Sequence, residues 1–98
     1  MNKESEELIS YAVYHKMFKD AYVSVIISCK DSSTLNPAQF RELAQTISLG
    51  ETALGHLDFL RARNIENPKL TAENDFLKSR VRELKDILYD PKREIVSG

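Results

Sequence analysis

The chain has 98 residues, of which 42% are hydrophobic and 30% charged, with three glycines and three prolines. This length fits one domain, and this composition excludes a disordered or membrane-embedded chain. The net charge of −1 argues against a nonspecific nucleic-acid binder, which is usually strongly basic. The single cysteine, Cys29, excludes an intrachain disulfide and indicates a reducing compartment.

The first predicted helix covers residues 4–29. Residues 21–29 alone are ambiguous, because β-branched side chains such as Val23, Val25 and Ile27 alternate as they would in a strand. We predict a helix, since no second strand is apparent and a helical face can also be formed, by Phe18, Tyr22, Val25, Ile26 and Cys29. The acidic N-terminal residues do not resemble a secretory signal, and this apolar run is too short to span a bilayer. We therefore expect a cytoplasmic protein.

The middle of the chain is predicted to form two helices, at 37–47 and about 51–63. Asn36 is a good N-cap, and Pro37 suits the first position of a helix. With about 100° per residue, the apolar stripe of the first segment does not continue into the second. The stripe shifts at residues 48–50, where Gly50 permits a tight turn. The alternative is one long helix softened by this glycine.

The last predicted helix, 69–90, has the clearest periodicity in the chain, and the proline that follows it begins a tail at 91–98. Its apolar residues and one asparagine repeat every seven residues, as in the a and d positions of a coiled coil. This pattern predicts a homodimer interface, and the alternative is an amphipathic helix that packs on its own domain. The interface candidates are Leu70, Asn74, Leu77, Val81, Leu84 and Leu88.

Residues that could support catalysis or metal binding do not form a motif. His15, Cys29 and His56 lack the spacing of metal ligands. The sequence contains no nucleophile motif and no glycine-rich phosphate loop. We therefore expect no enzyme activity, no catalytic residue, no metal and no cofactor.

Apolar spacing in the middle of the chain is carried by Leu43, Ala44, Ile47, Leu49, Ala53, Leu54, Leu57, Leu60, Asn64 and Ile65. On these residues, the region 20–66 resembles the helix-turn-helix of winged-helix repressors of the arsenic-sensor and antibiotic-resistance families. The resemblance implies that the second helix of the motif enters a DNA major groove. The DNA-binding candidates are then Thr52, Gly55, His56, Arg61 and Arg63.

Three features depart from that family pattern. Ser48 stands where the turn glycine is expected, and Glu51 and Asp58 place acidic groups where bases would face phosphates. A helix follows the motif in place of a β-wing.

Together these patterns predict an all-α domain of three to four helices, with a helix-turn-helix at 37–63 and a coiled-coil-like C-terminal helix. The first functional hypothesis is a small dimeric DNA-binding regulator. The alternative is a helical protein–protein interaction module that binds no nucleic acid: an adaptor, inhibitor or assembly subunit of a kind common in phage and plasmid genomes. The expected partners are a second copy, DNA or another protein, and not a membrane.

Overall fold

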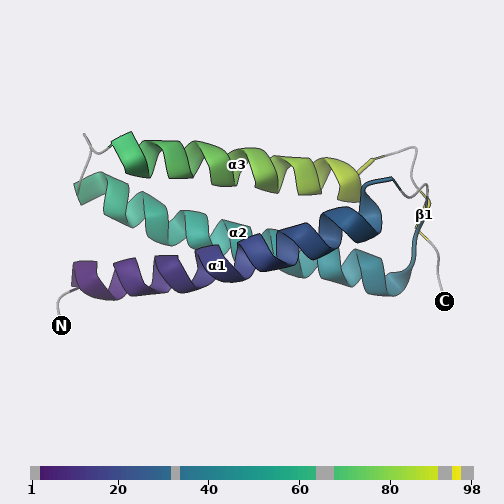
Figure 1. Ribbon diagram of the computed structural model, residues 1–98, viewed down its shortest axis with the longest axis horizontal. Coiled ribbons are helices and arrows are strands. Elements are labelled where there is room, and N and C mark those ends of the chain that lie inside the picture. Colours follow the sequence, from purple (N-terminus) through teal and green to yellow (C-terminus); the bar gives the residue numbers. More distant parts are fainter. Residues whose placement is uncertain (1–2, 32–33, 64–67, 91–93, 96–98) are drawn as a thin grey trace.

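Three helices form most of the described part of the chain, and they run alternately up and down the length of a compact bundle (Figure 1). They are α1 (Lys3–Cys29), α2 (Pro37–Arg63) and α3 (Pro68–Leu88). The predicted all-α class is therefore confirmed, and the described residues form three helices and not four. In this computed structural model, the residues described are 3–31, 34–63, 68–90 and 94–95.

Helix α1 is continuous, and it includes the ambiguous residues 21–29 as predicted. Phe18, Val25 and Cys29 have no exposed surface, and their spacing places them on one side of the helix. Burial of this side against the rest of the bundle outweighs the weak strand preference of the β-branched residues.

The start of α2 is fixed by a reciprocal cap between Asn36 and Gln39. The Gln39 backbone N–H donates to Asn36 Oδ1 at 2.8 Å, and the Asn36 backbone N–H donates to Gln39 Oε1 at 3.0 Å. This is a capping box with asparagine at the N-cap. The predicted cap is confirmed, although Gln39 was not predicted to be part of it. Gln39 Nε2 also donates to the backbone oxygen of Ser28 at 3.0 Å, so the same residue ties α2 to the end of α1.

Helix α2 runs unbroken from Pro37 to Arg63, so the predicted turn at 48–50 is wrong. The helix-turn-helix at 37–63 is accordingly not formed in the structure. The alternative of one long helix is the one observed, and the backbone of Gly50 is helical, without a positive φ.

The apolar stripe seemed to shift because two of its members are not hydrophobic. Thr46 and Gly50 are both buried, and they carry the buried face of α2 through the region where the sequence pattern appeared to break. The Thr46 hydroxyl donates to the backbone oxygen of Glu42 at 2.8 Å, which satisfies its hydrogen-bonding needs inside the bundle. Phe40, used for the predicted stripe, is 37% exposed.

Gly50 lies where all three helices approach one another. A Cβ atom at this position would be 2.5 Å from Val81 Cγ2 of α3 and 2.8 Å from Phe18 Cε1 of α1. The residue is therefore needed for close helix packing and not for a turn. By contrast, a Cβ atom at Gly55 would have no neighbour within 4 Å.

The heptad residues of α3, which we call its seam, pack against the other helices of the same chain. The seam residues Asn74, Leu77, Val81, Leu84 and Leu88 are buried in the bundle, and Leu70 packs against its edge. Asn74 Nδ2 donates to Asp58 Oδ1 of α2 at 3.2 Å, so this asparagine links α3 to α2. The predicted dimer interface is not confirmed, because these side chains already fill the core of the single chain.

A short parallel pairing closes one end of the bundle. Strand β1 (Thr34–Leu35) pairs with β2 (Glu94–Ile95), with Thr34 opposite Glu94 and Leu35 opposite Ile95. Leu35 is fully buried. Residues 94–95 belong to the predicted tail, and most of that tail lies outside the described residues, as do Asn64 and Ile65.

Candidate interaction surface

Two of the DNA-binding candidates on α2 have partners within the bundle. His56 points to α1, where its Nδ1 lies 2.5 Å from Glu7 Oε2 and its ring stacks on Tyr14 at 5.7 Å between centroids. The Thr52 hydroxyl donates to the backbone oxygen of Ser48 at 2.9 Å. These two side chains are therefore engaged within the bundle.

Of the remaining candidates, Gly55 is exposed, and the two arginines lie apart from each other. Arg63 stacks on Phe59, with its guanidinium carbon 3.9 Å from the ring centroid. Arg61 Nη1 lies 3.8 Å from Asp58 Oδ1, and about 100° per residue places Arg61 roughly opposite Arg63 around the helix. His56 therefore contacts α1, Thr52 bonds to its own helix, and the two arginines lie apart.

Groups of His, Cys, Asp and Glu that could hold a metal ion are absent among the described residues. Over the same residues, none of the helices is long and apolar enough to cross a membrane.

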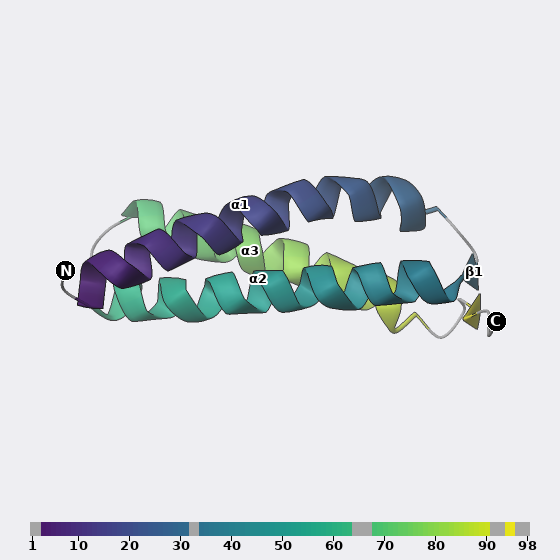
Figure 2. The same cartoon turned by 90° about the horizontal axis from the view of Figure 1, so that it is seen from below.

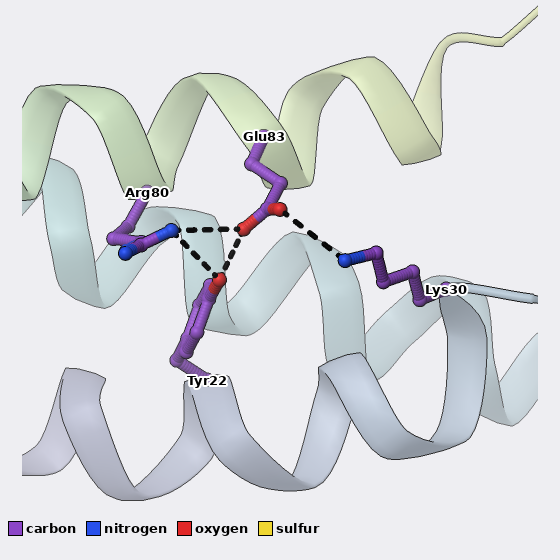
Figure 3. Close-up of polar contacts among 4 residues, drawn as sticks. All are labelled: Tyr22, Lys30, Arg80 and Glu83. Carbon is purple, nitrogen blue, oxygen red and sulfur yellow. Dashed lines mark hydrogen bonds and ion pairs between the residues drawn. The ribbon is translucent and has the colours of Figure 1, made fainter.

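Polar side chains join α1 to α3 at a cluster made of Tyr22, Lys30, Arg80 and Glu83 (Figure 3). The Tyr22 hydroxyl donates to Glu83 Oε1, and Arg80 Nη1 lies 3.7 Å from the same oxygen. Lys30 Nζ is 4.0 Å from Glu83 Oε2. Burial, followed by the hydrogen bond to Glu83, raises the pKa of Tyr22, so its hydroxyl stays a donor. This cluster links α1 to α3, and we assign it a structural role.

A second α1–α3 contact lies nearer the start of α1, around Tyr11 and His15. The Tyr11 hydroxyl donates to Glu73 Oε2 at 2.7 Å, and burial with this bond raises the Tyr11 pKa. The His15 ring stacks on Tyr11 and meets Phe76 edge-on. His15 Nε2 is buried, and within the described part of the chain it has no hydrogen-bond partner.

This environment predicts acid sensitivity. Burial lowers the His15 pKa, Glu73 partly opposes the change, and Lys19 reinforces it. A lowered folded pKa means that the neutral ring stabilises the fold above the unfolded value of about 6.5, and that this contribution is lost as the pH falls below it. We expect the free energy of unfolding, measured by urea titration at pH 7.5 and 5.5, to fall more in the wild type than in His15→Phe. An equal decrease in the free energy of unfolding of both proteins between pH 7.5 and 5.5 would contradict this account.

The outer side of α1 is the feature that the bundle leaves unexplained. Figure 2 shows α1 alongside α2 and crossing α3. The inner side of α1 is the one that buries Phe18, Val25 and Cys29. The large apolar side chains exposed on this helix range from 46% for Met17 to 82% for Ile27. At about 100° per residue, Ile9, Val13, Val23 and Ile27 lie on the side of α1 opposite Phe18, whereas Leu8 and Met17 lie on its two flanks. We call the side with Ile9, Val13, Val23 and Ile27 the outer face.

Helix α1 therefore carries apolar residues on both its sides. A helix that is apolar all round is normally buried on all sides, whereas α1 is covered on its inner side only. Single exposed apolar residues need no explanation, but a contiguous patch marks an interaction site. This surface was not predicted from the sequence, although apolar residues on opposite sides of residues 4–29 were a readable signal for it.

The fold and this surface define a small three-helix bundle with one open apolar helix face. Comparison with protein-family models, curated proteins and solved structures finds no match to the chain.

Proposed function

We propose that this chain is a helical protein–protein interaction module that binds a polypeptide through the outer face of α1. The observation that carries the proposal is the run of large apolar side chains along one side of this 27-residue helix. Burying apolar surface contributes about 25 cal/mol per Å², so a partner helix or sheet laid along this face would gain binding energy from each of them.

The charge of the chain suits a protein partner better than DNA. The net charge is −1, and a protein partner needs no strongly basic surface. The DNA-binding hypothesis depended on a recognition helix separated by a turn at 48–50, and α2 is continuous there. We therefore favour the interaction module over the DNA-binding regulator.

A photo-crosslinking experiment tests the proposal. A benzophenone amino acid at Ile27 of the full chain, illuminated in the cells that make it, should give an adduct with a polypeptide identified by mass spectrometry. The same probe at Ala72, an exposed residue of α3, is the matched control. Absence of an adduct specific to Ile27 would contradict the proposal.

Replacing an outer-face residue by a charge should abolish binding without unfolding the bundle. Ile27 is 82% exposed, so Ile27→Glu should change the free energy of unfolding of the monomeric chain by no more than about 0.5 kcal/mol. The carboxylate would nevertheless have to be desolvated in a complex, which is strongly unfavourable. Circular dichroism melting and recovery of the partner on the tagged chain measure the two effects.

Binding to DNA is the competing outcome, and a titration with mixed-sequence duplex at low salt examines it. We expect no saturable binding. Salt-sensitive binding that Arg63→Ala weakens would favour the regulator instead.

A further inference from the structure

We infer that the polypeptide bound by the outer face of α1 is the same face of a second copy, packed antiparallel about a two-fold axis near residue 18. The inference rests on the proposed function and names the partner of that surface.

The outer face has the spacing of a coiled-coil seam. Its central line is formed by residues separated alternately by four and three positions, which is the a/d spacing of a heptad repeat. The line extends for about 27 Å at 1.5 Å per residue, and all of its members are exposed. They are Ile9, Val13, Lys16, Asp20, Val23 and Ile27.

The same types of apolar side chain occur at equal distances from the centre of this seam in both directions. In an antiparallel pair centred at residue 18, residue i lies opposite residue 36 − i of the other copy. Ile9 then meets Ile27, and Val13 meets Val23. Each contact occurs twice, as a two-fold interface requires.

The charged residues at the centre of the seam favour the antiparallel orientation over the parallel one. In the antiparallel pair Lys16 lies opposite Asp20 of the other copy, so two ion pairs form beside the axis. A parallel pair in register would instead place Lys16 against Lys16 and Asp20 against Asp20. Opposed like charges in an interface are strongly unfavourable, and complementary charges fix register.

Residues beyond the two ends of the seam and beside its centre are compatible with the same pairing. Glu6 lies opposite Lys30 under the same rule. The Lys30 side chain is 57% exposed and 4.0 Å from Glu83 of its own chain. Met17, 46% exposed, lies close to its own copy on one flank of the axis. Lys19, on the other flank, reaches solvent with its long side chain.

Charge reversal tests the pairing on the full chain. Sedimentation equilibrium should give a dimer for the wild type. Lys16→Asp and Asp20→Lys should each weaken it by about tenfold or more, because each variant opposes like charges twice. An equimolar mixture of the two variants should regain dimer, since every pair is then of opposite charge. Lys78→Asp and Asp75→Lys, exposed on α3, are the controls matched in net charge.

Cysteine pairing tests the orientation. Mixed Val13→Cys and Val23→Cys chains should form a disulfide-linked heterodimer on oxidation with diamide. Val13→Cys alone should not, because the two copies of residue 13 lie about 15 Å apart along the axis. Native Cys29 is buried, so it forms the same background in every variant.

Three results are separable. Monomeric wild type that still gives an Ile27 adduct with another protein would overturn the antiparallel pair and leave the proposed function standing. Loss of both dimer and adduct would overturn both. A dimer unaffected by the charge variants, or linked efficiently by Val13→Cys alone, would overturn the stated register.

Discussion

Leu77→Asp should abolish folding of the chain. Leu77 is fully buried at the centre of the α3 seam. Removing its side chain costs about 2–5 kcal/mol, and an unpaired carboxylate in the core adds several more. The total approaches the whole stability of a domain, about 5–15 kcal/mol. Circular dichroism should show loss of helix and of the cooperative thermal transition.

The control is Ser79→Asp, which adds the same charge at an exposed position of the same helix and should leave the melt almost unchanged. The pair also separates the two hypotheses for the heptad seam. A folded monomer of Leu77→Asp would mean that the seam normally faces a second copy, contrary to the single-chain core described above.

Gly50→Ala and Gly55→Ala should change stability in opposite directions. Alanine is favoured over glycine inside a helix by roughly 1 kcal/mol, and Gly55 has open space around it, so Gly55→Ala should stabilise by up to that amount. At Gly50 the new methyl would overlap Val81 and Phe18. Overpacking of this kind costs about 1–3 kcal/mol, and we expect a net loss. Urea unfolding measures both values.

The clash can be attributed to its neighbour with a double-mutant cycle. Val81→Ala should cost less in the Gly50→Ala background than in the wild type, because it removes one of the two clashing groups. Equal costs in both backgrounds, or a stabilised Gly50→Ala, would mean that the helices are further apart at this point.

Helical periodicity predicted much of the fold. The continuous helix α1, the N-cap at Asn36 and the helical C-terminal segment follow from local signals, and local signals depend on neighbouring residues alone. The unbroken path of α2 could not be read in this way. Gly50 has the same intrinsic preferences whether it lies in a turn or between packed helices, and only its neighbours Phe18 and Val81 decide between them.

The same reason limited the interpretation of α3. A heptad pattern indicates that one face of a helix is buried, but it does not indicate whether the covering helix comes from the same chain. Leu77 and Leu84 would look identical in either case. The outer face of α1 was not predicted for a related reason, because an apolar side chain such as Ile27 looks the same in the sequence whether it is buried or exposed.

The continuity of α2 is the central claim, since it replaces the helix-turn-helix by a bundle and leaves the outer face of α1 as the interaction surface. Amide hydrogen exchange measured by NMR at Leu49, Gly50 and Glu51 tests it most directly. An unbroken helix predicts slow exchange there, with opening free energies close to those of Leu43 and Leu57. Fast exchange at the three central amides, flanked by protected helices on both sides, would contradict it.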